Sequence, residues 1–171
     1  MRSMQDVESY FKKINDPGKG LTVSGGAREG DEHTLILALI GYIETQSAPL
    51  FQDGMLALME KCPDITAIVV DMTGLTYLSS MGIGALLTVQ NKATENGRRL
   101  LLHGASEKVW SVISQLGFGD TFERIGNLDE LSDGFPMNVS CPQCGKKLRA
   151  SKPGTYRCPA CKAQLSVEAR R

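Results

Sequence analysis

Four of the five cysteines lie near the C-terminus, in two pairs with the same internal spacing. Cys141 and Cys144 form the first pair, and Cys158 and Cys161 form the second, with 13 residues between the pairs. A turn with this spacing can present two thiolates to one ion, and four sulfur ligands favour tetrahedral zinc. Iron and redox-active thiols are the alternatives for the same pattern.

The metal implied by these cysteines should be structural, because four protein ligands leave no open coordination position. About 35 residues bury little core, so metal binding must supply most of the folding free energy of this segment. Between the cysteine pairs, residues 146–150 and 155–157 are expected to form one hairpin across Lys152, Pro153 and Gly154. The segment resembles zinc ribbons.

Two adjacent serines form the second group of residues that could take part in chemistry. Ile65–Val70 is a β-branched run that predicts a buried strand ending at Asp71, and Ser80–Asn96 has the apolar spacing of a helix. Ser79 or Ser80 then lies at a helix N-terminus, where free N–H groups and the helix dipole favour negative charge. A phosphate there would place about two negative charges on the surface. An ordinary capping serine explains the same local pattern.

The remaining residues do not form a recognisable catalytic site. His33 and His103 are the only histidines, and neither belongs to a known motif with a nucleophile. Gly82 and Gly84 are too few for a dinucleotide-binding loop, although they keep the predicted first helical turn slim enough for a partner to approach. Cys62 stands alone beside Pro63, with no nearby His or cationic cluster to activate it. We therefore expect no enzymatic activity.

The elements that position these residues follow from apolar periodicity. We expect strands over residues 21–23, 33–43, 65–70, 99–103 and 122–125, and helices over residues 3–16, 45–61, 80–96 and 107–116, the last one capped by Ser106. The run from His33 to Ile43 is apolar on both faces, which predicts a buried strand. A turn is expected over Gly25–Glu32 and another over Leu128–Leu131. Strands alternate with helices from residue 33 onward, which indicates an α/β fold with a mixed, mostly parallel sheet.

Charge and composition divide the chain into two main parts. Residues 137–171 carry eight Lys or Arg and one Glu, which leaves 11 basic and 18 acidic residues in 1–136. We expect an N-terminal amphipathic helix within 1–18, a main domain over 19–133, a linker over 134–138 and the ribbon over 139–171. No apolar run approaches the roughly 20 residues of a membrane span, and the charged start does not resemble an export signal. A cytoplasmic protein is expected.

The main domain resembles the STAS domain, which is shared by anti-sigma factor antagonists and the tails of sulfate transporters. The family signature matches Tyr77-Leu78, Ser79-Ser80-Met81, Gly82-Ile83-Gly84 and Ala85-Leu86-Leu87. A second family feature, a strand–helix junction, matches Gly41-Tyr42-Ile43-Glu44-Thr45-Gln46-Ser47-Ala48. A third is the late helix that ends in Leu116-Gly117-Phe118 before Phe122.

This resemblance implies an anti-sigma factor antagonist that acts by partner switching. Ser80 occupies the position that a partner kinase phosphorylates, with Ser79 as the alternative acceptor. Ser79 and Glu44 each stand where the family has Asp. The resemblance also implies a partner-binding surface made of Glu44, Thr45, Ser79, Met81, Gly82 and Ile83. The implied partners are an anti-sigma factor that is a serine kinase of histidine-kinase-like ATPase fold, and a metal-dependent serine phosphatase.

Other functions are compatible with the same sequence. One is a STAS scaffold or adaptor subunit of a signalling or lipid-transport assembly, without phosphorylation. Another is a nucleic-acid-binding adaptor that uses the basic ribbon, which is less favoured because Tyr156 is the only aromatic residue within it. The N-terminal stripe of Val7, Tyr10, Phe11 and Ile14 can pack on the main domain or form a homodimer.

Overall fold

The computed structural model describes residues 7–12, 14–15, 18–29, 31–127, 137–150 and 154–168. The chain divides into two compact units, Met1–Ile125 and Gly126–Arg171. Each unit has its own cluster of buried apolar side chains. No helix among these described residues is long and apolar enough to cross a membrane.

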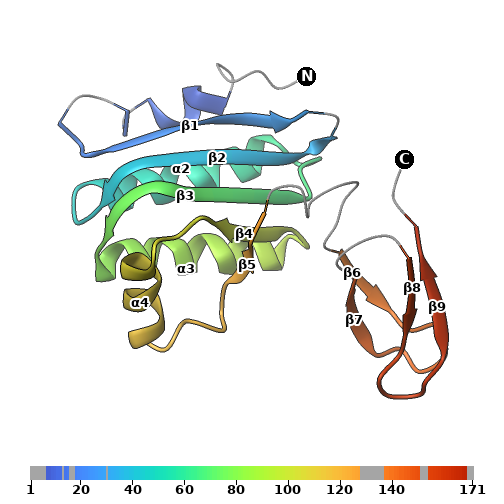
Figure 1. Ribbon diagram of the computed structural model, residues 1–171. Helices are drawn as coiled ribbons and strands as arrows, with labels where there is room; N and C mark the ends of the chain where they lie inside the picture. Colours follow the sequence, from blue (N-terminus) through green and yellow to red (C-terminus); the bar gives the residue numbers. More distant parts are fainter. Residues whose placement is uncertain are drawn as a thin grey trace. The chain divides into compact units, whose positions relative to one another are not determined.

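The first unit is built on a five-stranded sheet in the order β1-β2-β3-β4-β5 (Figure 1). The strands are β1 (Leu21–Arg28), β2 (Asp31–Ile43), β3 (Ala67–Leu78), β4 (Arg99–His103) and β5 (Glu123–Ile125). β1 pairs antiparallel with β2, and the other three pairings are parallel. The helices are α2 (Ser47–Lys61), α3 (Ser80–Glu95) and α4 (Glu107–Gln115). The predicted mixed, mostly parallel sheet with packed helices is confirmed.

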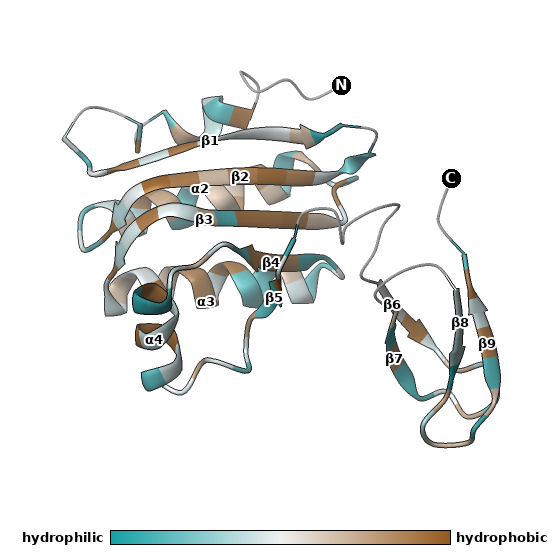
Figure 2. Cartoon of the chain, viewed as in Figure 1, coloured by the Kyte–Doolittle hydropathy of each residue, from teal (hydrophilic) through white to brown (hydrophobic). Residues whose placement is uncertain are grey.

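The main core cluster lies on one face of this sheet. On β2, Leu35, Leu37 and Leu39 are fully buried and share one cluster with buried residues of all three helices. The alternate residues face the other way, and Ile40 is 58% exposed. The expectation that β2 is buried on both faces is therefore wrong, because the helices that form the core pack on only one of them. Figure 2 shows the apolar colour over much of β2 and over part of β3, whose remaining part is pale or hydrophilic.

Two strands are longer than their composition predicts. β1 continues through the glycine-rich segment to Arg28 and β2 begins at Asp31, so most of the predicted turn over Gly25–Glu32 lies in strands. β3 does not end at Asp71 but continues to Leu78. The polar residues after Asp71 remain in the sheet because β2 extends beside them as far as Ile43 and offers a backbone partner.

The N-terminal stripe packs on the first unit. Among the described residues, the predicted helix over 3–16 contains the short 3₁₀ helix η1 (Ser9–Phe11), and Val7, Phe11 and Ile14 are buried in the core. The Asn15 amide donates to the Val23 carbonyl and accepts from the Val23 N–H, so it serves as a partner for edge strand β1. The turn predicted over residues 128–131 lies outside the described residues, as do residues 134–136 of the predicted linker.

The second unit consists of two antiparallel hairpins. β6 (Met137–Ser140) pairs with β7 (Lys147–Ala150), and β8 (Gly154–Arg157) pairs with β9 (Gln164–Val167). The predicted hairpin between residues 146–150 and 155–157 is therefore wrong. Each cysteine pair forms the turn of its own hairpin, so each strand pairs with the strand across that turn. Ala150, Leu165 and Val167 are buried between the hairpins, together with Cys141 and Cys158.

Candidate functional site

The two serines at the start of α3 occupy different environments. Ser79 is the N-cap of α3, and its hydroxyl accepts a hydrogen bond from the backbone N–H of Gly82 at 3.1 Å. Its backbone N–H donates to the carbonyl of Ile43 at 2.9 Å, which ties the helix start to the end of β2. Ser79 is half-buried, whereas Ser80, the first residue of the helix, is exposed. Ser80 therefore presents its hydroxyl to solvent.

The helix start around Ser80 favours negative charge. The first turn of α3 contains no acidic side chain, so no carboxylate from that turn offsets the positive end of the helix dipole. The Ser79 hydroxyl satisfies one of the N–H groups that an α-helix leaves without an intrahelical partner. An anionic group on Ser80 would lie beside the remaining ones. The acceptor role of Ser80, or of Ser79 in its place, stays a prediction.

The six residues predicted to bind a partner are not all on the surface. Thr45 and Met81 are exposed, and Glu44 and Ser79 are half-buried. Ile83 is only 1% exposed and belongs to the core, and Gly82 is buried as well. These last two residues are thus structural neighbours of the site, which corrects their placement on the predicted surface.

The two glycines of the first helical turn have different roles. A Cβ on Gly82 would lie 2.7 Å from Cδ1 of Leu78 and 2.9 Å from Cγ2 of Ile43, so Gly82 lets α3 pack closely against the ends of β2 and β3. Gly84 is exposed, and a Cβ there would meet no atom within 4 Å. Only Gly84 therefore leaves open space on the outer surface, whereas Gly82 is required for internal packing.

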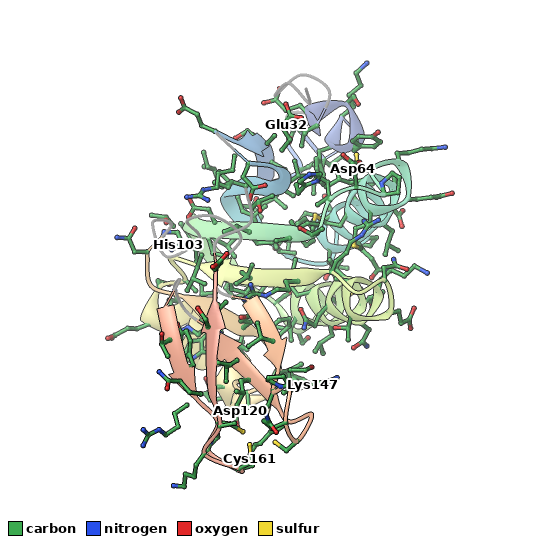
Figure 3. The ribbon with its side chains drawn as sticks, turned by 90° about the vertical axis from the view of Figure 1, so that its right-hand side faces the viewer. Glu32, Asp64, His103, Asp120, Lys147 and Cys161 are labelled. Carbon is green, nitrogen blue, oxygen red and sulfur yellow. The ribbon has the colours of Figure 1, made fainter. Side chains whose placement is uncertain are left out.

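The four paired cysteines form one cluster in the second unit. All four sulfur atoms lie within 4.8 Å of one another. The sulfurs of Cys141 and Cys161 are 3.5 Å apart, and those of Cys144 and Cys158 are 3.6 Å apart. Four thiolates at about 2.3 Å from a tetrahedral zinc ion would be separated by about 3.8 Å. The cluster therefore fits a metal ion of this kind, and Figure 3 labels Cys161 among its yellow sulfur atoms.

The two cysteine turns share one backbone geometry. The N–H of Cys141 donates to the carbonyl of Lys146 at 2.8 Å, and the N–H of Gly145 donates to the carbonyl of Cys141 at 2.9 Å. In the second turn, Cys158 donates to Ala163 at 2.8 Å and Lys162 donates to Cys158 at 2.9 Å. The two hairpins are thus structural repeats, and each places two sulfurs on the same centre.

Backbone N–H groups in these turns also favour thiolates. Hydrogen bonds from the backbone of Cys144 and Gln143 lower the pKa of the Cys141 thiol. The backbone N–H of Cys161 lowers the pKa of Cys158 from 9.0 to about 6, although burial opposes this shift. The Ala163 N–H favours the Cys161 thiolate, but burial and the other three cysteines together raise the Cys161 pKa to about 12. Without a metal, the cluster therefore holds both a thiolate and a thiol.

The other titratable or nucleophilic candidates have structural contacts. Nδ1 of His33 lies 2.9 Å from the carbonyl of Asp64, and Nδ1 of His103 lies 3.4 Å from the carbonyl of Ile125. Both contacts join neighbouring segments of the first unit. Cys62 ends α2 and is 3% exposed.

Sequence reasoning missed one surface feature near Ser80. Tyr42 and Tyr77 are paired across β2 and β3, and they are 36% and 47% exposed. Both lie in the two segments that resemble the STAS domain. Their alternation with buried Ile43 and Leu78 could have indicated an outward-facing aromatic pair.

Comparisons with known proteins agree with this architecture. Residues 27–131 match the STAS domain family, and residues 139–170 match a domain of unknown function, DUF8512. No curated protein matches the chain. The unphosphorylated anti-sigma factor antagonist SpoIIAA has a similar structure, with a TM-score of 0.50 and 15% identity over 64% of this chain and 92% of that one. An anti-sigma factor antagonist from Mycobacterium paratuberculosis has a TM-score of 0.51 and 21% identity over 64% of this chain and 89% of its own.

The two solved structures and the family match support different conclusions. At such identities the two solved structures establish a shared fold. The match to the family extends further, because it spans more than half of the 171 residues and includes β2 to β5 together with α3 and both serines. The chain therefore belongs to the STAS domain family.

Proposed function

We propose that this chain is a partner-switching regulator of the anti-sigma factor antagonist type, and that Ser80 is its switch. The observation that carries the proposal is the difference between the two serines. Ser79 uses its hydroxyl to cap α3, whereas Ser80 exposes its hydroxyl at the same helix start. A similar solved structure is an anti-sigma factor antagonist in an unphosphorylated form, which is consistent with a phosphorylation switch.

In this proposal the unphosphorylated chain binds an anti-sigma factor and releases a sigma factor or another client. The anti-sigma factor is also a serine kinase of histidine-kinase-like ATPase fold. The Ser80 oxygen attacks the γ-phosphorus of ATP, ADP leaves, and the hydroxyl proton passes to a base of the kinase. The new phosphate adds about two negative charges to the contact surface and breaks the complex. A metal-dependent phosphatase then hydrolyses the phosphoserine, so this chain supplies a substrate hydroxyl and a docking surface.

The four cysteines hold a structural zinc ion in the second unit. The two sulfur pairs, 3.5 Å and 3.6 Å apart, already approach the spacing of a tetrahedral site. Four thiolate ligands leave no position for a substrate, so the zinc stabilises the two hairpins and takes no part in catalysis.

Phosphorylation is tested with the kinases of this ATPase fold that the source genome encodes. Each purified kinase is incubated with the full chain and ATP, and intact mass is measured. We expect one added phosphate, which is lost in Ser80→Ala and retained in Ser79→Ala. Ser106→Ala is the matched control, because Ser106 caps α4 as Ser79 caps α3. If no kinase modifies the chain, or if Ser80→Ala is still modified at Ser79, Ser80 is not the switch.

Zinc is tested separately by elemental analysis of the purified chain. We expect one zinc ion per chain, and none after Cys141 and Cys158 are both replaced by Ser. A chain purified under reducing conditions that contains iron or no metal would contradict the zinc assignment.

A further inference from the structure

The ends of β2 and β3 expose several large apolar side chains. The described residues include five large hydrophobic side chains that are exposed, and three of them, Ile40, Tyr42 and Tyr77, lie on these strand ends. We call these three residues the strand-end patch. Met81, the fourth, directly follows Ser80, and Leu116 at the end of α4 is the fifth. Apolar residues that gather in this way commonly mark an interaction site.

The two tyrosines of the patch share one face of the sheet. Tyr42 pairs with Tyr77 across the β2–β3 ladder, which places the two side chains next to each other. Their neighbours Ile43 and Leu78 also pair with each other, and both are buried in the core. Because successive side chains in a strand point to opposite faces, the two tyrosines point away from the helices.

Local backbone geometry holds Tyr42 in this position. The β2–β3 register is irregular between Ala38 and Ile40 and again between Gly41 and Tyr42, and such irregularities redirect side chains. Gly41 has φ +114°, and a Cβ there would lie 2.1 Å from the Gly20 carbonyl oxygen. The Tyr42 ring lies against Gly20, where a Cβ would be 2.2 Å from the ring. The Tyr42 side chain is thus held in place before a partner binds, which lowers the entropy cost of binding.

Distance along the chain connects the patch to Ser80. Tyr77 precedes Ser80 by three residues, so their Cα atoms are at most about 11 Å apart. A protein interface buries about 800 Å² on each partner, which corresponds to a radius of about 16 Å. An interface of this size that is centred on the Ser80 hydroxyl is therefore large enough to include Tyr77 and its neighbour Tyr42.

We propose that the strand-end patch is the docking surface for the kinase that phosphorylates Ser80, with Tyr42 and Tyr77 as its anchors. This inference rests on the proposed function. The kinase presents an apolar surface to the two rings, and the affinity of the complex resides in these contacts rather than in the Ser80 hydroxyl. The phosphate then acts by introducing charge at the border of an apolar interface, where its desolvation is costly.

The test uses the full chain and the kinase that modifies it in the mass assay. Tyr42→Thr and Tyr77→Thr remove the rings and keep side chains that suit a strand. Leu116→Thr is the matched control, because it removes an equally exposed apolar side chain from the end of α4. Affinity is measured by calorimetry, and phosphorylation by steady-state kinetics. The single tryptophan, Trp110, reports by its fluorescence whether each variant is folded.

We expect each tyrosine variant to weaken kinase binding by about tenfold or more and to raise KM with kcat nearly unchanged. Leu116→Thr and Ser80→Ala should bind within about twofold of the native chain. If the tyrosine variants bind normally while Ser80 is still phosphorylated, the docking surface is wrong and the proposed function stands. If no kinase modifies Ser80, both fail together. If the tyrosine changes abolish only self-association in sedimentation experiments, a second copy occupies the patch and the inference is overturned.

Discussion

The hydroxyl of Ser79 accepts a hydrogen bond from the backbone N–H of Gly82 at 3.1 Å. The two adjacent serines therefore have different roles. The Ser79 oxygen is used to cap the helix, whereas the next side chain, Ser80, is exposed. Asp and Ser are both good N-cap residues. The Ser that replaces the family's Asp at position 79 therefore keeps the cap of α3 and removes one negative charge beside the proposed acceptor.

The cap leads to a stability prediction for position 79. Ser79→Ala should lower the free energy of unfolding of the first unit by about 1 kcal/mol, since it leaves the Gly82 N–H without its partner. Ser79→Asp should change it by only a few tenths of that amount. Denaturant unfolding followed by Trp110 fluorescence measures both variants, with Ser80→Ala as the exposed control. Equal stability of Ser79→Ala and Ser80→Ala would show that the cap contributes nothing.

Replacing either of the two glycines of α3 by Ala should change the stability of the first unit, but in opposite directions. Gly82→Ala should destabilise the first unit by about 1–3 kcal/mol, because its Cβ would lie 2.7 Å from Leu78 and 2.9 Å from Ile43. Gly84→Ala should stabilise it by about 0.5–1 kcal/mol, because Ala is the better helix former and its Cβ meets no atom within 4 Å. The same fluorescence measurement applies. A loss of stability in both variants would mean that the outer surface of α3 is also packed.

Local sequence patterns predicted those parts of the fold that local forces determine. Strand β4 has the predicted bounds Arg99–His103, and Ser106 caps α4 by accepting from the Val109 N–H. The four cysteines form a single cluster, as their spacing indicates. In these cases, apolar alternation, a capping hydroxyl or a short turn is sufficient to fix the structure.

The remaining features depend on partners that are distant in the sequence. The residues after Asp71 look like a polar turn, yet Thr76 is held in β3 and its hydroxyl donates to the carbonyl of Gly41 at 2.9 Å. The position of the exposed Tyr42 side chain depends on its contact with Gly20, which precedes β1. The pairing of the ribbon strands depends on the backbone hydrogen bonds that close each cysteine turn. Periodicity along one segment carries no information about such contacts.

Metal removal should affect the two units differently. A strong chelator should abolish the structure of the cysteine hairpins, whose core contains few apolar residues beyond Ala150, Leu165 and Val167. The unfolding of the first unit, followed by Trp110 fluorescence, should not change. Circular dichroism and elemental analysis before and after chelation measure the outcome. Hairpins that keep their structure without metal would contradict a metal-dependent fold.

The pH dependence of metal binding follows from the thiol pKa values. Metal binds the thiolate, so protons compete and the affinity must fall as the pH falls. At pH 7.5 the metal-free Cys158, with a pKa of about 6, is already ionised, whereas Cys161, with a pKa of about 12, is protonated. Binding of zinc should therefore release about three protons or fewer rather than four. Calorimetry in buffers of different ionisation enthalpy counts these protons, and a release of four would show that Cys158 is protonated.

The repeated cysteine turns predict a stabilising change. Lys162 has φ +65°, and it is the only residue other than glycine with positive φ among those that the structure describes. Its counterpart in the first turn is Gly145, with φ +74°. Side chains are strained in this region of backbone conformation, so Lys162→Gly should stabilise the metal-bound hairpins by about 1 kcal/mol.

The reverse change provides the control. Gly145→Ala should destabilise the hairpins by a similar amount, and purely through backbone strain, because a Cβ there meets no atom within 4 Å. Since folding and metal binding are linked, each change should alter the zinc affinity by about fivefold, upward for Lys162→Gly and downward for Gly145→Ala. Competition with a chromophoric chelator measures both variants. If Lys162→Gly weakens zinc binding, the Lys162 side chain contributes a contact that outweighs the strain, and the two turns are not energetically equivalent.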